Sequence, residues 1–162
     1  MFNTLKKRIK NEKGLSLVEL LAVIVILAIV AAIAIPAIGN IIENSRYNAV
    51  KSDAINVLNA AQLYYTDNPG GEAAEGSSVG AATTTSITVG QLITGKYLET
   101  AGKIPEGATV ASSQPYKLTA TVQNAVGSKT VTFTNATLTQ ITADKQKGSA
   151  TTINAIGTAS NQ

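Results

Sequence analysis

LSLVELLAVIVILAIVAAIAIPAIG, residues 15–39, is a nearly uninterrupted apolar run that contains one carboxylate, Glu19. A helix crosses a bilayer with about 20 apolar residues, so the run predicts a transmembrane helix. A charged side chain at the centre of such a helix costs roughly 2.5 to 3.5 kcal/mol. An acid in this setting needs a partner, which makes Glu19 the first candidate functional residue of the chain.

A short basic leader, residues 1–14, precedes the run and ends at Gly14. Its basic residues are Lys6, Lys7, Arg8, Lys10 and Lys13. If the chain is cut after Gly14, the new N-terminus at Leu15 carries an ammonium group within reach of Glu19 in a neighbouring copy. The two charges then neutralise each other in lipid, so cleavage would create the partner that the acid needs.

The segment KGLSLVE, residues 13–19, together with the apolar helix that follows, resembles the type III signal of type IV prepilins. The resemblance implies cleavage by a prepilin peptidase between Gly14 and Leu15, N-methylation of Leu15, and assembly into a filament through Leu15 and Glu19. The partners it implies are membrane lipid before assembly, the peptidase, the pilus assembly machinery with its ATPase and membrane platform, and further copies of the chain in a homopolymeric filament. The implied location is a single pass through the inner or cytoplasmic membrane, followed by an extracellular pilus.

An uncleaved signal anchor is the alternative interpretation of this N-terminus. A secretory signal peptide is cut after its apolar segment, whereas Gly14 lies before the apolar segment. In both interpretations the basic leader stays in the cytoplasm, as the positive-inside rule requires. They differ at Glu19, for which an inert anchor has no use.

The composition argues against several classes of function. Cysteine and histidine are absent, which removes disulfides, thiolate chemistry, the commonest metal ligand and the usual general base. We therefore expect no catalytic residue, no metal site and no cofactor, and the protein is not expected to be an enzyme. The leader holds five of the 13 basic residues and one of the ten acidic ones, so the mature chain is nearly neutral. A nucleic-acid groove is not expected on such a body, and DNA binding stays open only for a filament that repeats the same lysines many times.

Helical periodicity continues after Pro36. The residues of one apolar stripe are Ile38, Ile41, Ile42, Val50, Ala54, Val57, Leu58, Ala61 and Tyr65, and the charged residues off that stripe are Glu43, Arg46, Lys51 and Asp53. The helix should stop at residues 67–71, where a proline and two glycines occur. Residues 15–65 then form one helix of about 75 Å. Pro36 lacks the N–H that would bond to Ala32, so we expect a weakened helix between Ala28 and Pro36.

The rest of the chain predicts a small head. Residues 72–86 read as a loop, and residues 88–98 as a short helix with Thr88 as N-cap and Gly95 near its end. Leu92, Ile93, Tyr97 and Leu98 should then be buried. Period-two alternation predicts an antiparallel hairpin from residues 116–123 and 130–134, with residues 124–127 as the connection. Residues 136–142 are expected as a third strand and residues 151–156 as a short fourth.

The predicted fold class is α+β, with a long N-terminal helix packed on a small antiparallel sheet, which is the pilin fold that the resemblance implies. The expected segments are the cleaved leader at 1–14, the transmembrane or filament-core half of the helix at 15–39, the amphipathic half at 40–66, and the head at 67–162.

The sequence offers two further candidate sites, one for calcium and one for glycosylation. Calcium needs six to eight oxygen ligands, but Asp144 is the one carboxylate beyond Glu106. The sequence Asn135-Ala136-Thr137 matches the N-glycosylation pattern, although a turn explains it equally well.

The expected function is that of a structural subunit of a type IV pilus, serving adhesion, motility or DNA uptake. A pseudopilin of a type II secretion or competence system is the alternative within the same family. A monomeric membrane-anchored binding domain is the alternative from a different class.

Overall fold

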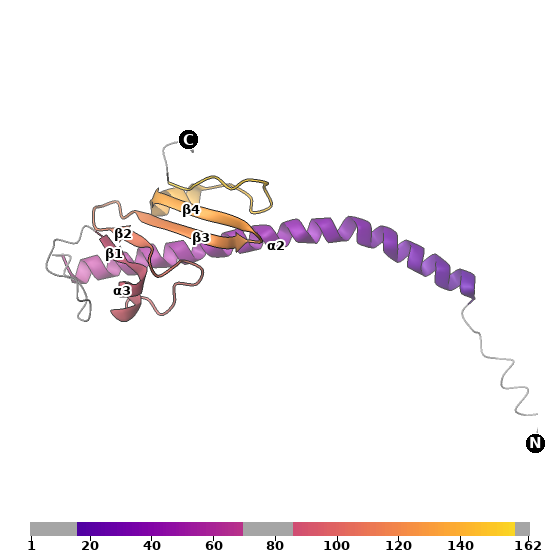
Figure 1. Ribbon diagram of the computed structural model, residues 1–162, viewed down its shortest axis with the longest axis horizontal. Coiled ribbons are helices and arrows are strands. Elements are labelled where there is room, and N and C mark those ends of the chain that lie inside the picture. The colour runs from indigo at the N-terminus through magenta and orange to yellow at the C-terminus, as the bar shows by residue number, and fades with distance from the viewer. Residues whose placement is uncertain (1–15, 70–85, 158–162) are drawn as a thin grey trace, which may run out of the picture. The chain divides into compact units, whose positions relative to one another are not determined.

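The computed structural model describes residues 16–69 and 86–157 (Figure 1). The chain divides into two units, residues 1–39 and 40–162, and each is described by itself. Gly14, Leu15 and nearly all of the loop predicted at 72–86 lie outside the described residues.

One long helix, α2 (Leu17–Asp67), contains 51 residues. It confirms the single helix expected at 15–65. The helix ends where the sequence predicts, because the N–H of Asn68 makes the last bond, to the carbonyl of Tyr64 at 2.8 Å, and Pro69 follows. It is long and apolar enough to cross a membrane.

The head contains an antiparallel four-stranded sheet in the order β1-β2-β3-β4. The strands are β1 (Ser86–Thr88), β2 (Thr109–Ala111), β3 (Leu118–Val126) and β4 (Lys129–Ala136). The sequence did not reveal β1 and β2, since three residues are too few to display alternation. Together with α2, the sheet confirms the expected α+β, pilin-like arrangement.

The hairpin of β3 and β4 was predicted correctly, but β3 continues through most of the expected connection at 124–127, as far as Val126. A register shift between Val122 and Val126 marks a bulge in β3. Asn124 adopts a left-handed backbone conformation there, with φ of 50°, and such an irregularity lets the strand continue past the two extra residues. The turn itself comes at Gly127, which has a φ of 62°.

The prediction of a third strand at residues 136–142 is wrong, because most of these residues belong to a helix, α4 (Leu138–Ala143). Thr137 and Gln140 form a capping box at its start, and this reciprocal pair satisfies two N–H groups that a strand would offer to a neighbour. The fourth predicted strand is also wrong. Residues 151–156 form no strand, and Ile156 makes an isolated parallel bridge to Phe133.

The short helix α3 (Val89–Thr94) confirms its prediction, with Thr88 as N-cap and Gly95 as C-cap. Thr88 forms a capping box with Gln91. Leu92 is fully buried, while Ile93, Tyr97 and Leu98 are partly buried against the core.

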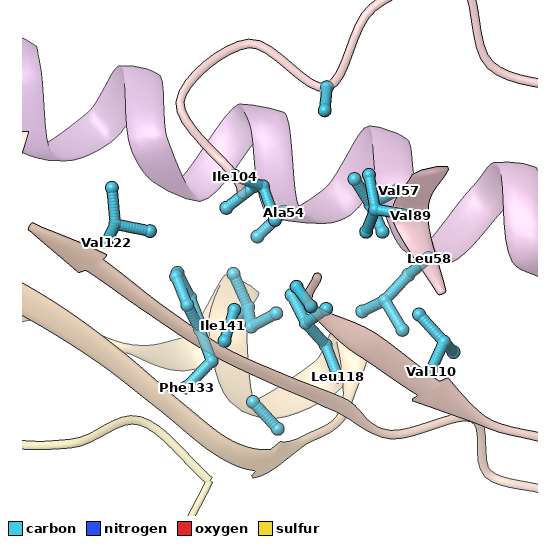
Figure 2. Packing of buried hydrophobic residues seen from close by; sticks show 14 of the residues in the cluster. Ala54, Val57, Leu58, Val89, Ile104, Val110, Leu118, Val122, Phe133 and Ile141 are labelled. Atoms are coloured by element: carbon cyan, nitrogen blue, oxygen red, sulfur yellow. The ribbon is translucent and has the colours of Figure 1, made fainter. Parts of the chain in front are cut away.

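The core of the head lies between the sheet and one face of α2. Figure 2 shows Ala54, Val57 and Leu58 of α2 facing Leu118 and Phe133 of the hairpin. The buried residues of α2 are Tyr47, Val50, Ala54, Val57, Leu58, Ala60, Ala61, Tyr64 and Tyr65. The predicted stripe therefore holds from Val50 onward.

The beginning of that stripe is exposed. Ile38, Ile41 and Ile42 are 53%, 66% and 45% exposed. The first buried residue of α2 is Tyr47, so nothing in the described part of the chain covers these three isoleucines.

Candidate processing and assembly site

The described chain begins next to the predicted cleavage point, at Ser16. Ser16 is the N-cap of α2: its carbonyl accepts from the N–H of Leu20 at 3.1 Å, and its Oγ accepts from the N–H of Val18 at 3.3 Å. The roles predicted for Gly14 and Leu15 concern residues outside the described part and stay predictions.

Glu19 bonds to the start of its own helix. Its Oε2 accepts from the N–H of Ser16 at 2.9 Å. Ser16 and Glu19 stand three residues apart, which is the spacing of a capping box, and the carboxylate also lies at the positive end of the helix dipole. Sequence reasoning gave Glu19 a partner in another copy and missed this one, although the Ser-x-x-Glu spacing was there to be recognised.

Glu19 and Ser16 are both exposed in the isolated chain. A second charged group can therefore reach the carboxylate without unfolding anything. An ammonium at Leu15 of another copy would meet an acceptor that is already held in place by one N–H.

The apolar half of α2 has no cover. No residue between Leu17 and Gly39 is buried. Its exposed large side chains are Leu17, Val18, Leu20, Leu21, Val23, Ile24, Val25, Ile26, Leu27, Ile29, Val30, Ile33, Ile35 and Ile38. They surround the helix on all sides, and such a helix requires lipid or other apolar helices around it.

Pro36 lies inside α2, and the described helix continues through it. Proline has no N–H to donate to the carbonyl of Ala32. Gly39, three residues later, further lowers the helix propensity of this stretch, and a side chain there would meet nothing within 4 Å. A weakened segment between Ala28 and Pro36 remains a prediction.

In the second half of α2, three charged side chains bind the head. Glu43 pairs with Lys129 at 2.9 Å, Asp53 accepts from the N–H of Lys103 at 2.8 Å, and Lys51 pairs with Asp144 at 3.3 Å. The opposite, exposed side carries Ser45, Ala49, Ser52, Asn56, Asn59 and Leu63, none of them charged, with Arg46 at its margin. A helix face with so little charge is unusual for a surface in permanent contact with water.

The two further sites weighed from the sequence can now be located. Both carboxylate oxygens of Asp144 already have protein partners, Tyr47 and Lys51 on Oδ2 and Gln146 on Oδ1. Within residues 16–69 and 86–157, no three carboxylates gather as a metal site would require. Asn135 is exposed at the end of β4 with a φ of 51°, and Thr137 of the same pattern caps α4.

Comparison with known proteins gives one match. Residues 9–35 match the family model described as the prokaryotic N-terminal methylation motif. The searches of curated proteins and of solved structures found no significant match. The matched segment contains Gly14, Leu15 and Glu19, so the chain carries a type IV prepilin-like signal sequence.

This match, over residues 9–35, supports a type IV pilin-like or pseudopilin precursor. Such a signal implies processing by a prepilin peptidase and handling by an assembly machinery, and the apolar helix is consistent with membrane anchoring before assembly. Proteins with this motif are structural rather than enzymatic.

Proposed function

We propose that this chain is the structural subunit of a type IV pilus, which polymerises through α2 into an extracellular filament. One observation carries the proposal: an apolar helix half, exposed on all sides, bears a single acid, Glu19, five residues after the matched signal's Gly14.

Before assembly, lipid would cover residues 15–39 and the basic leader would stay in the cytoplasm. Cleavage after Gly14 removes the leader and leaves an ammonium at Leu15. The attraction between this ammonium and Glu19 of a neighbouring copy is strong in a low-dielectric setting, and it removes the cost of leaving either charge unpaired there. Glu19 would keep or exchange its bond to Ser16 as the new partner arrives.

The second half of α2 supports the same assembly. Three of its charged residues, Glu43, Lys51 and Asp53, bind the head. Its exposed side, from Ile41 to Leu63, is uncharged apart from Arg46 at its margin. Neighbouring helices can pack against such a face without burying unpaired charges.

The alternative, a pseudopilin of a type II secretion or competence system, has the same N-terminal motif. Electron microscopy of sheared surface material, combined with mass identification of this chain, separates the two. Long filaments that contain the chain support the pilus. A processed chain that is retained in the cell envelope, with no surface filament, supports the pseudopilin instead.

A monomeric membrane-anchored binding domain is the remaining rival. It requires neither cleavage nor self-association. If cross-linking in membranes yields the unprocessed monomer alone, the polymer proposal is wrong.

A further inference from the structure

Asp144 stands at the end of α4 and meets two residues of α2 that lie one helical turn apart. Its Oδ2 accepts from Tyr47 Oη at 2.7 Å and lies 3.3 Å from Lys51 Nζ. Lys51 Nζ also donates to the backbone carbonyl of Asp144 at 2.6 Å. The side chains of Lys51 and Asp144 are only 13% and 6% exposed, so this ion pair is largely shielded from water.

Shielding from water and hydrogen bonding shift the pKa of Asp144 in opposite directions. Burial disfavours the charged carboxylate, but the hydrogen bonds from Tyr47, Gln146 and Lys51, together with the charge of Lys51, outweigh it and lower the pKa of Asp144. The same burial, with the neighbouring carboxylate, raises the pKa of Tyr47. Tyr47 therefore remains a donor and Asp144 remains an acceptor over the whole neutral range.

Beyond Asp144, residues 144–157 lie along α2 and then along β4 (Figure 1). The N–H of Ser149 donates to Asn44 Oδ1 at 3.0 Å, and Lys129 Nζ donates to the carbonyl of Gly148 at 2.8 Å. Gly148 packs so closely on α2 that a Cβ there would collide with the backbone of Glu43. The segment thus has several contacts with the helix, but Asp144 makes the charged ones.

The far end of the segment covers the outer edge of the sheet. The N–H of Ile156 donates to the carbonyl of Thr132 at 2.9 Å, and the N–H of Thr134 donates to the carbonyl of Ile156 at 2.8 Å. These bonds satisfy groups of β4 that would otherwise be an open strand edge. Such an edge is a ready template for pairing with another chain.

The segment is also tied to itself. Gln146 and Asn154 exchange two hydrogen bonds: the N–H of Asn154 donates to Gln146 Oε1 at 2.7 Å, and Gln146 Nε2 donates to the carbonyl of Asn154 at 3.2 Å. These two bonds close the loop between Gln146 and Asn154. Gln146 also donates to Asp144 Oδ1 at 2.9 Å, which links the loop directly to the ion pair.

We propose that Tyr47, Lys51 and Asp144 form a non-covalent clasp that keeps residues 144–157 closed over α2 and the edge of β4, and that breaking the clasp opens this segment as a unit. The chain contains no cysteine, so a disulfide cannot do this. The clasp keeps the β4 edge from pairing with a second copy. The inference concerns the head alone and does not depend on the proposed pilus function.

The test is hydrogen exchange of the full-length protein in detergent micelles, comparing Asp144→Asn and the milder Tyr47→Phe with wild type. The reporters are the amides of Ser149, Asn154 and Ile156, whose acceptors are known. We expect their exchange to accelerate about tenfold or more in Asp144→Asn, as the loss of charged hydrogen bonds would cause. Tyr47→Phe should give a smaller change in the same direction.

The matched control is Asp53→Asn. Asp53 is a carboxylate of α2 that holds a different loop, through the N–H of Lys103. Its reporter amides should exchange at the wild-type rate. Unchanged exchange in both clasp variants would overturn the proposal. So would equal acceleration at β3 amides such as that of Val122, because the cluster would then stabilise the head as a whole rather than hold one segment. If Asp144→Asn does not fold, Tyr47→Phe decides by the same criteria.

Discussion

At Glu19, two donors compete for one carboxylate. The N–H of Ser16 holds it within the chain at 2.9 Å, and the ammonium of Leu15 in a neighbouring copy is the proposed partner after cleavage. A capping bond near a helix N-terminus contributes about 0.3 to 1 kcal/mol through the dipole, whereas an unpaired charge in a low-dielectric setting costs several kcal/mol. Because the cost of an unpaired charge is the larger of the two, we expect the loss of Glu19 to impair assembly far more than it destabilises the helix.

Replacing Glu19 with Val should leave the leader cleavable and the head folded, because neither depends on this carboxylate. Filament assembly should fail. The measurement is the yield of surface filament relative to the cellular level of processed subunit. Glu99→Val, which removes an exposed carboxylate of the head, is the control and should assemble normally. Abundant filaments from Glu19→Val would mean that the acid is only a helix cap.

Asp144 makes the stability of the head depend on pH. Its pKa is lowered in the folded chain, so its contribution is fully present above the unfolded value of about 3.9. It is lost as the pH falls below that value, through the folded pKa. The groups facing it are Tyr47 and Lys51 of α2 and Gln146 of its own segment, and Tyr47 stays protonated throughout because its pKa is raised.

We therefore expect Asp144→Asn to lower the free energy of unfolding by about 1.5 to 3 kcal/mol at pH 7, the range for hydrogen bonds to a charged group. The difference from wild type should shrink as the pH falls below the unfolded pKa of about 3.9. Urea unfolding of the full chain in micelles at several pH values measures both quantities. A difference that does not shrink in acid would show that the charge of Asp144 is irrelevant.

At the scale of elements, the sequence predicted those helices and helix ends that depend on residues close together in the chain. The apolar run, the break after Asp67, and the cap at Thr88 all act within a few residues, and α2 and α3 were predicted correctly. The misassigned strand at 136–142 shows the limit of period-two patterns, since Thr137 and Gln140 carry a capping box that outweighs the alternation. The clasp could not be predicted, because Tyr47 and Asp144 are 97 residues apart and no local pattern links them.

The cap of α4 provides a direct test at this scale. Thr137→Ala removes the side-chain oxygen that accepts from the N–H of Gln140 at 3.3 Å. We expect a loss of about 1 kcal/mol in the free energy of unfolding, as for other N-cap substitutions. Thr137→Ser keeps the oxygen and should stay near wild type, as denaturant unfolding of both variants can show. Equal losses in the two would point to packing of the threonine methyl instead.

Pro36 bears on the behaviour of α2 in the filament. The missing bond to Ala32 makes this the weakest part of the helix, and Gly39 adds to the weakness. We expect a filament structure to show the helix interrupted between Ala28 and Pro36, and the Pro36→Ala filament to show it continuous and to stretch less under force. A wild-type filament with an unbroken, straight helix through Pro36 would contradict this part of the mechanism.

For the whole molecule, charge and hydrophobicity are distributed unevenly among the basic leader, the apolar half of α2 and the head. The precursor has a net charge of +3, but five of its basic residues belong to the leader. The proposed cleavage would leave a nearly neutral chain with one apolar, uncovered helix half and one well-packed head. Neutral subunits can pack closely in a polymer without mutual repulsion, so in the proposed assembly removal of the leader would act in two ways, by exposing an ammonium and by discarding charge.

Cleavage is therefore the step on which the whole proposal depends, and we predict that the assembled protein begins at Leu15. Intact-mass analysis of filament material should give a chain that starts there and carries one added N-methyl group. Gly14→Val should block cleavage, because the prepilin peptidase needs a small residue at this position and valine is larger. The uncut chain should then accumulate in the membrane without filaments. Glu19→Val is the matched comparison, since it should be cut but not assembled. Assembled material that begins at Met1, or filaments from Gly14→Val, would show that polymerisation needs no new N-terminus, and the pairing of Leu15 with Glu19 would then be wrong.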